Sequence, residues 1–257
     1  MAELKALLFD VDGTLADTEK DGHRPAFNMA FEEAGLDWHW DEDLYGELLA
    51  VTGGKERIKF YLEKFNTGFQ KPADFDDFVK GLHASKTEFY KQLMAEGKIP
   101  LRPGVERLIR QARNEKVRMA VVTTTTPANV TALLTNTLGA DSESWFEVIA
   151  AGDIVPAKKP APDIYFWAME QMDLQPEECM AFEDSANGIK SSIAANIKTI
   201  ITINGYTKED DFSAAELVLT DMGEPGVPFT VLSGASYDHH YLDLALINKV
   251  HKELYKA

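Results

Sequence analysis

The chain has 257 residues, of which 45% are hydrophobic and 10% aromatic, and this composition excludes a chain that is disordered throughout. Lys and Arg number 26 against 42 Asp and Glu, which gives a net charge of -16 and disfavours binding to nucleic acid or to an anionic membrane. No apolar stretch approaches the roughly 18 residues that a membrane span needs.

We expect a cytoplasmic, monomeric protein. The single cysteine, Cys179, fits a reducing compartment, because one cysteine cannot form an internal disulfide. The N-terminus runs directly into a strand pattern, which leaves no room for a leader, so a location in the plastid stroma would need a transit peptide that the sequence lacks. A monomer is expected because no segment of the sequence indicates an interface.

An apolar run predicts the first strand over residues 5–12, and Gly13 ends it. The next segment has apolar residues at helical spacing, which predicts helices at 24–36, 41–51, 55–65 and 74–96. Gly97 follows the last of them, as a glycine just past a helix usually does. We therefore expect a helical insertion over residues 17–98.

From Pro103 onward the pattern changes to alternating helices and strands. Helices are expected at 105–115, 128–138, 163–172 and 186–195, and strands at 118–123, 146–150, 179–182, 199–203 and 217–219. The tail predicts a loop at 224–228 and a helix at 241–255. Such alternation predicts an α/β fold with a doubly wound, mostly parallel, Rossmann-like sheet. The core would comprise residues 1–16 and 99–257, with the insertion after its first strand.

Polar residues stand where several of these strands end. They are Asp10 and Asp12, Thr123, and Glu183 and Asp184. The carboxyl ends of parallel strands form the edge where open α/β sheets bind ligands, so these side chains should meet there. Lys159, in a Lys-Pro-Ala-Pro string, would join them. This set of residues suits a phosphate held by a divalent cation.

The residue types fit the hydrolysis of a phosphate ester. Asp10 can attack phosphorus as a carboxylate and form an aspartyl-phosphate. Asp12, one pleat period later on the same face, can protonate the leaving oxygen and then deprotonate the attacking water. Thr123 or Thr124 can hold phosphoryl oxygens, and the apolar run before them does not fix which. Lys159 can neutralise charge in the transition state.

Carboxylates at this edge also predict a metal site. Asp184, with Glu183 as a further candidate, supplies the hard oxygen ligands that Mg²⁺ prefers. The ion would offset the repulsion among four clustered carboxylates and a phosphate.

Four short strings, at residues 7–15, 120–123, 159–162 and 182–185, carry these polar residues. In this order they resemble the haloacid dehalogenase superfamily over essentially the whole chain. The resemblance implies that Asp10 is the nucleophile, that Asp12 is the general acid and base, and that Thr123 and Lys159 bind phosphate. It also implies Mg²⁺ held by Asp10, the Asp12 carbonyl and Asp184, and a mobile helical cap over residues 17–98. Dehalogenases of the superfamily lack the second aspartate, so Asp12 argues against that chemistry here.

Two cap segments, residues 17–24 and 51–58, resemble the CbbY-type sugar bisphosphatases. In that family these positions line the substrate pocket, and the substrate is xylulose 1,5-bisphosphate, an inhibitor of Rubisco. The substrate-binding residues implied are Glu19, His23, Arg24, Gly53, Gly54, Lys55 and Arg57. The physical interpretation agrees, because bare N–H groups at a Gly-Gly helix start and two nearby cations suit a second phosphate. Glu19 and His23 could form hydrogen bonds with sugar hydroxyls.

The residues of the cap and the function of the chain each admit alternative interpretations. Gly53 and Gly54 could form only a turn, with Lys55, Arg57 and Lys59 on a solvated face. The leading function is an Mg²⁺-dependent phosphatase for a small sugar bisphosphate. The alternatives are a sugar phosphomutase resembling β-phosphoglucomutase, a broad-range sugar monophosphate phosphatase, and a non-catalytic phosphosugar sensor. A threonine after the Asp-Gly pair is typical of phosphatases rather than mutases, and a sensor would not need the second aspartate.

Overall fold

A computed structural model describes residues 3–51 and 53–256 of the chain. The chain divides into two compact units. The core unit runs up to Asp17 and resumes at Pro100, and the helical unit is Thr18–Ile99. Thr52, in the second of the two cap segments, lies outside the described residues.

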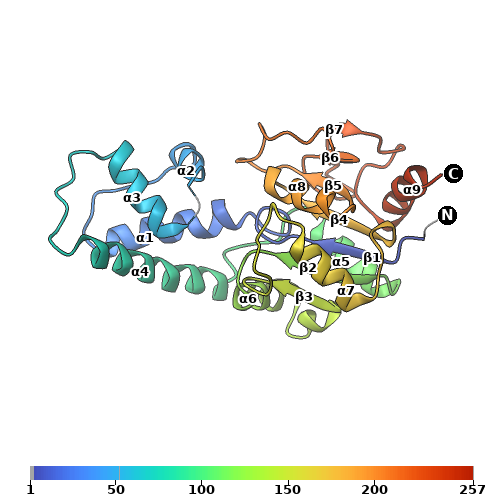
Figure 1. Ribbon diagram of the computed structural model, residues 1–257, viewed down its shortest axis with the longest axis horizontal. Helices are drawn as coiled ribbons and strands as arrows, with labels where there is room; N and C mark the ends of the chain where they lie inside the picture. The colour runs from blue at the N-terminus through green and yellow to red at the C-terminus, as the bar shows by residue number, and fades with distance from the viewer. Residues whose placement is uncertain (1–2, 52, 257) are drawn as a thin grey trace. The chain divides into compact units, whose positions relative to one another are not determined.

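The described part of the core unit forms a seven-stranded sheet with the order β3-β2-β1-β4-β5-β6-β7 (Figure 1). Every neighbouring pair is parallel except β6 and β7, which are antiparallel. The strands are β1 Ala6–Phe9, β2 Arg118–Thr123, β3 Val148–Ala151, β4 Cys179–Glu183, β5 Lys198–Thr202, β6 Leu217–Leu219 and β7 Val231–Gly234.

The central strands are buried on both faces, which explains why they read as continuous apolar runs. In the register of the sheet, Phe9 lies opposite Val121 of β2 and Phe182 of β4. The rings of Phe9 and Phe182 stack with centroids 4.7 Å apart. Asp10, the next residue after β1, therefore emerges between the carboxyl ends of β2 and β4.

Helices cover both faces of this sheet (Figure 1). They are α5 Val105–Asn114, α6 Pro127–Leu138, α7 Asp163–Met172, α8 Ala186–Ala194 and α9 Leu244–Leu254, with short 3₁₀ turns at Ser142–Trp145 and Pro176–Glu178. For this strand order, the right-handed crossovers that parallel strands follow place α5 and α6 over one face and α7 and α8 over the other. Contacts between α5 and α9 and between α7 and α8 build the two layers. The expectation of a doubly wound, mostly parallel α/β fold is confirmed.

Over its described residues, 18–51 and 53–99, the helical unit comprises a π-helical turn, η1 Thr18–His23, and four helices, α1 Arg24–Glu33, α2 Glu42–Leu48, α3 Gly54–Lys64 and α4 Phe75–Ala95. Helix α1 packs along α4. The core of the helical unit is aromatic. Fully buried rings come from Phe27, Phe31, Trp40 and Tyr45, and the centroids of the Phe27 and Trp40 rings lie 4.7 Å apart. Such dense ring packing gives a small helical unit a core of its own.

The structure differs from the sequence-based expectation in three elements. The first strand ends at Phe9 rather than at residue 12, because the turn already begins at Val11, whose carbonyl accepts from the Leu15 N–H at 2.9 Å. A π-helical turn precedes α1, where only an α-helix starting at residue 24 was expected. Strand β7 was not expected at all, because all its residues are exposed and its conformation comes from pairing with β6.

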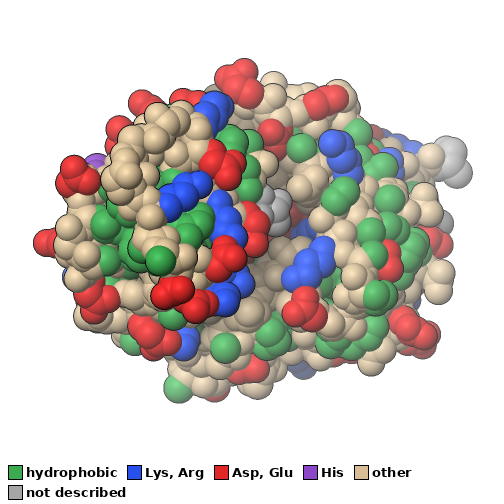
Figure 2. Space-filling view, turned by 60° about the vertical axis from the view of Figure 1, so that its left-hand side comes forward, with side chains coloured by type: hydrophobic (Ala, Val, Ile, Leu, Met, Phe, Trp, Pro, Cys, Tyr) green, Lys and Arg blue, Asp and Glu red, His purple; other side chains and the backbone are tan. Residues whose placement is uncertain are grey.

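Among the described residues, no helix combines the length and the apolar character that crossing a bilayer requires. Figure 2 shows Asp and Glu side chains spread over the visible face, with Lys and Arg side chains between them. This distribution matches the net charge of -16.

Candidate active site

The residues expected at the carboxyl edge of the sheet meet around the ammonium group of Lys159. Its Nζ lies 2.7 Å from Asp10 Oδ1, 2.6 Å from Glu183 Oε1 and 2.8 Å from the Val122 carbonyl oxygen. An ammonium has three N–H donors, and these three acceptors use all of them. The Asp10 carboxylate and the Lys159 ammonium are both almost completely buried.

This arrangement fixes the charge of Lys159. Burial alone would lower its pKa, but the carboxylates of Asp10 and Glu183 outweigh burial and raise the pKa above its ordinary value. Burial also raises the pKa of Glu183. Because three acceptors surround Nζ, the lysine is protonated, and Glu183 faces it as the other half of an ion pair.

Tyr165 is a member of this site that the sequence did not reveal. Its hydroxyl donates to Glu183 Oε1 at 2.5 Å, and its ring centroid lies 5.3 Å from Lys159 Nζ. Burial and the Glu183 carboxylate raise the pKa of the Tyr165 phenol well above its ordinary value, so it remains a donor. In the sequence Tyr165 is one of several apolar residues on one face of a helix, and nothing distinguishes it from a packing residue.

Asp184 follows β4 and is held by Asn204. The amide Nδ2 of Asn204 donates to Asp184 Oδ2 at 2.6 Å, and its Oδ1 accepts from the backbone N–H of Tyr206 at 2.9 Å. Burial, together with the nearby carboxylates of Asp10 and Glu183, raises the pKa of Asp184 well above its ordinary value. Asn204 lies in a loop after β5, where no sequence signal indicated a role.

A carboxylate cluster of Asp10, Glu183 and Asp184 fits a divalent cation. Each residue offers one oxygen, and these oxygens lie within 4.8 Å of one another. Burial and the negative charges of Asp10 and Glu183 together raise the pKa of Asp184, so a cation at this cluster would relieve a surplus of negative charge. Hard carboxylate oxygens are the donors that Mg²⁺ prefers. The residues therefore suit the ion, although Glu183 Oε1 is already shared by Lys159 and Tyr165.

Asp12 belongs to a tight turn beside this cluster. It is half-buried, and the turn is closed by the Gly13 N–H, which donates to the Ala16 carbonyl at 2.7 Å. A Cβ atom on Gly13 would lie 2.1 Å from Asp184 Oδ2 and 2.7 Å from Asn204 Nδ2. Only glycine fits at this position, so the turn and Asp184 are in direct contact.

The two candidate threonines differ in environment. Thr123 is the last residue of β2 and is buried, and its Oγ1 accepts from the Thr125 N–H at 3.3 Å. Thr124 is the first residue beyond the strand and is exposed. The structure thus ends the strand at Thr123 and leaves Thr124 in the following bend.

In the helical unit, Glu19, Tyr45 and Arg57 form a hydrogen-bonded chain. The Tyr45 hydroxyl donates to Glu19 Oε2 at 2.5 Å and accepts from Arg57 Nη1 at 2.7 Å. Arg57 Nη1 also lies 3.7 Å from Glu19 Oε2. Burial raises the pKa of Glu19, but His23, Arg57, the Tyr45 hydroxyl and Lys86 together hold it below its ordinary value.

The alternative in which Arg57 belongs to a solvated face is wrong. Its side chain is buried, and its guanidinium also donates to the carbonyls of Leu48 at 3.2 Å and Val51 at 3.4 Å. Lys55 is exposed, and Lys59 pairs with Asp76 at 2.7 Å. Residues two apart on a helix point in different directions, which explains why Lys55 and Arg57 do not share an environment.

His23 and Lys86 form a second contact in this unit. Lys86 Nζ lies 2.6 Å from His23 Nδ1, and the His23 ring stacks on Tyr90 with centroids 4.1 Å apart. Burial, followed by the charge of Lys86, lowers the pKa of His23 to about 3. His23 is therefore neutral at physiological pH and accepts a hydrogen bond from the lysine.

The remaining cap residues lie at helix starts. Arg24 begins α1, and its guanidinium lies 3.6 Å from Glu42. Gly54 begins α3, and Gly53, with a φ of 98°, precedes it without a side-chain cap. A Cβ on Gly54 would lie 2.5 Å from a ring atom of His83. The Gly-Gly pair thus opens a helix whose first N–H groups carry no side-chain acceptor at the cap position.

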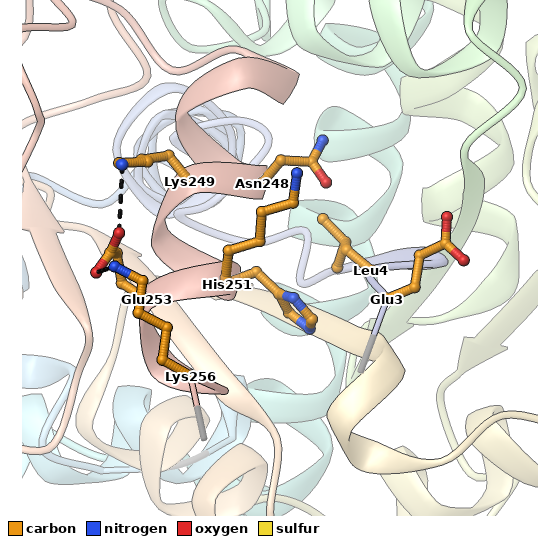
Figure 3. Close-up of a pocket in the computed structure, with 8 residues that line it drawn as sticks. Glu3, Leu4, Asn248, Lys249, His251, Glu253 and Lys256 are labelled. Atoms are coloured by element: carbon orange, nitrogen blue, oxygen red, sulfur yellow. Dashed lines mark hydrogen bonds and ion pairs between the residues drawn. The ribbon is translucent and has the colours of Figure 1, made fainter. Parts of the chain in front are cut away.

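A separate cavity of about 590 Å³ lies between α9 and the residues that precede β1 (Figure 3). Figure 3 shows Asn248 and His251 projecting from α9 toward Glu3 and Leu4. Lys249 and Glu253, which also line the cavity, form an ion pair at 3.2 Å. Because Leu4 precedes β1 and Asp10 follows it, this cavity lies at the opposite end of the strand from the carboxylate cluster.

Comparison with known proteins adds to these observations. Residues 4–196 match the family model of haloacid dehalogenase-like hydrolases. Protein CbbY (plasmid) of Cupriavidus necator is 43% identical over 249 residues, which cover 96% of this chain and 97% of that protein. The crystal structure of CbbY from Rhodobacter sphaeroides in complex with phosphate superposes with a TM-score of 0.72 at 45% identity, covering 87% of this chain and 96% of that one. A mutant of the same protein, in complex with xylulose-(1,5)bisphosphate, matches with the same TM-score at 44% identity and the same coverage.

Proposed function

This chain belongs to the haloacid dehalogenase-like hydrolase family, in which it is a sugar phosphatase, and we propose that it hydrolyses xylulose 1,5-bisphosphate with Mg²⁺ through an aspartyl-phosphate at Asp10. The observation that carries the proposal is the position of the Asp10 carboxylate. It lies 2.7 Å from the Lys159 ammonium and within 4.8 Å of the oxygens offered by Glu183 and Asp184.

In the proposed reaction, a carboxylate oxygen of Asp10 attacks phosphorus while the bond from phosphorus to the ester oxygen breaks. Asp12 gives its proton to the departing sugar oxygen. Asp12 then takes a proton from water, which attacks the phosphoryl group, breaks its bond to Asp10 and releases inorganic phosphate. The nucleophile and the acid are both regenerated at the end of the cycle.

Lys159 and Thr123 would bind the phosphoryl oxygens during this transfer. The buried ammonium stabilises the negative charge that develops, at a place from which water is excluded. Glu183 and Tyr165 hold the ammonium in position, because Glu183 Oε1 accepts from both Lys159 and the Tyr165 hydroxyl. We therefore assign Glu183 to the orientation of Lys159 rather than to the metal.

Asp10, Asp184 and the Asp12 carbonyl would hold Mg²⁺. When bound, the ion supplies positive charge that neutralises the phosphate and the surplus of carboxylates. Asn204 donates to Asp184 Oδ2, which leaves Oδ1 available as a ligand and fixes the orientation of the carboxylate.

The helical unit would contribute substrate recognition. The exposed Lys55 and the uncapped start of α3 at Gly53 and Gly54 suit the second phosphate of a bisphosphate. Glu19 and His23 would hydrogen-bond sugar hydroxyls. Arg57 would act through Tyr45 and Glu19, since its guanidinium is buried and engaged with them.

Release of inorganic phosphate, measured with Mg²⁺ and with EDTA on a panel of sugar mono- and bisphosphates, tests the proposal. We expect Mg²⁺-dependent release that strongly favours xylulose 1,5-bisphosphate. Release from monophosphates alone would support a phosphatase but contradict the assignment of a bisphosphate substrate. Interconversion of hexose phosphates without free phosphate would identify a mutase instead.

Two variants test the assigned roles. Asp12→Asn should abolish turnover while substrate still binds, because the amide can neither give nor take the proton. Asp153→Asn is the matched control, since Asp153 is exposed and pairs only with Lys158 among the contacts of the described residues. Unchanged turnover in the Asp12 variant would contradict the proposed role.

A further inference from the structure

Arg102 is a buried arginine two residues after Pro100, where the chain re-enters the core unit. Its side chain is 6% exposed. The guanidinium donates to the carbonyl oxygens of Gly13, Thr202, Ile203 and Thr220, with distances of 3.1 Å to Thr202 and 3.0 Å to Thr220. Its Nε lies 3.2 Å from Asp17 Oδ1. The four N–H groups on Nη1 and Nη2 are thus directed at backbone carbonyls inside the core, and the Nε side of the guanidinium faces the Asp17 carboxylate as an ion pair.

These contacts join strands that are not neighbours in the sheet. Gly13 lies in the turn after β1, whereas Thr202 ends β5 and Thr220 follows β6. Strand β4 lies between β1 and β5. The guanidinium therefore ties together the segments on either side of the strand end that carries Asp184.

The main chain of Arg102 holds the same turn a second time. Its N–H donates to the Leu15 carbonyl at 2.9 Å, and Leu101 forms an isolated β-bridge with Ala16. The turn after Asp12 is thus anchored to Arg102 through both a backbone and a side-chain hydrogen bond.

Displacement of this turn would reach the catalytic groups directly. Gly13 is the residue next to Asp12, and its Cα lies so close to Asp184 that a Cβ atom would be 2.1 Å from Oδ2. A shift of the Gly13 carbonyl would therefore move Asp12 and change the space available to Asp184.

We propose that Arg102 is a positioning residue of this enzyme: it fixes the Asp12–Gly13 turn against Asp184 and so sets the geometry for proton transfer and metal binding. The inference rests on the proposed function. Lysine cannot replace arginine here, because an ammonium lacks the planar fork that reaches acceptors on several segments at once.

Arg107, five residues further along the chain in α5, offers a matched comparison. Its guanidinium also donates to backbone carbonyls, those of Leu242 at 2.9 Å and Gly223 at 2.8 Å, and pairs with Glu224 at 3.0 Å. These partners belong to the C-terminal segment, which carries none of the proposed catalytic residues. Substitution of Arg107 should affect stability alone.

The experiment compares Arg102→Lys with Arg107→Lys in the full-length chain. For Arg102→Lys we expect kcat to fall by about 100-fold with a smaller change in KM, since small displacements of catalytic groups act mainly on the reacting centre. Mg²⁺ binding without substrate, followed by calorimetry, should weaken by about 10-fold. Arg107→Lys should lower the melting temperature but retain wild-type kcat and Mg²⁺ affinity.

Wild-type kcat and Mg²⁺ affinity in a folded Arg102→Lys variant would overturn the inference. Equal losses in both variants, in proportion to their melting temperatures, would also overturn it and leave a structural role only. If the Arg102→Lys variant does not fold, amide hydrogen exchange of the wild-type protein tests the inference instead. The amides of Gly13 and Arg102 should then exchange as slowly as those of β1. Rapid exchange at these amides would refute the anchoring of the turn by Arg102. Absence of phosphatase activity in the wild type would refute the proposed function, whereas the Mg²⁺ affinities would still test Arg102.

Discussion

Lys159 Nζ lies 2.7 Å from Asp10 Oδ1, and both groups are almost completely buried at the centre of the sheet's carboxyl edge. Buried charges at this distance interact strongly, because little water screens them. The pair therefore defines the part of the site that responds most sharply to substitution.

Lys159→Met should lower kcat by about 100- to 1000-fold, because it removes the cation that stabilises the transferring phosphoryl group. Steady-state phosphate release measures the effect. Lys158→Met is the control: Lys158 is half-exposed and pairs with the exposed Asp153, so its kcat should stay within about twofold of the wild type. Equal losses in the two variants would contradict the role of Lys159.

Gly13→Ala should abolish activity and weaken Mg²⁺ binding. The added methyl would meet Asp184 Oδ2 at 2.1 Å, and a φ of 87° is unfavourable for alanine. Gly205→Ala is the matched control, since a Cβ there meets no atom within 4 Å. Calorimetric Mg²⁺ titration of both variants gives the answer, and retained affinity in Gly13→Ala would refute the close packing of the turn on Asp184.

Arg57→Met should destabilise the protein by about 1–3 kcal/mol, since it leaves buried acceptors at Tyr45 and Leu48 without their donor. Lys59→Met, two residues along the same helix, should change the free energy of unfolding by less than about 0.5 kcal/mol, because Lys59 and its partner Asp76 are exposed. Urea unfolding compares the two. A similar small effect for both would show that Arg57 contributes only at the surface.

The stability of the protein should fall with pH below about 6.5 because of His23. Its pKa is 6.5 ordinarily and about 3 in the fold, so between these values the unfolded state binds a proton that the folded state does not. The loss amounts to at most about 1.4 kcal/mol per pH unit, and His23 makes no contribution above pH 6.5.

Urea unfolding of the wild type and of His23→Gln at pH 7, 6 and 5 checks this slope. The glutamine variant should show a weaker pH dependence, whereas His240→Gln, at an exposed position, should match the wild type. Parallel curves for all three proteins would mean that the pKa of His23 is the same in the folded and unfolded states.

Elements that are buried in the fold could be predicted, because their burial leaves a pattern of apolar residues in the sequence. Strands β2 and β4 are continuous apolar runs, and the residues at their ends converge with Asp10 because parallel strands end at one edge. Tyr165 was missed because a tyrosine on the apolar face of a helix has the same pattern whether it packs or donates a hydrogen bond. Asn204 and Tyr45 depend on contacts between distant segments, which no local pattern contains.

The cap residues show where sequence spacing misled the interpretation. Lys55 and Arg57 are two positions apart and were assigned the same kind of role, but the helix exposes the first and buries the second. Strand β7 had no alternating pattern to indicate it, because its residues are all exposed. The roles of the site residues in catalysis and binding stay predictions, to be tested by the substitutions above.

The saturation of Lys159 has a consequence for ligand choice. All three of its N–H groups already have acceptors, two of which are carboxylates, so an incoming ligand must displace one of them. A neutral hydroxyl competes poorly with a carboxylate for an ammonium, whereas a doubly charged phosphate competes well. An arriving phosphate that takes the N–H now bound to Asp10 would release that carboxylate as a nucleophile. The same exchange makes free phosphate, the product, a competitor for the resting enzyme.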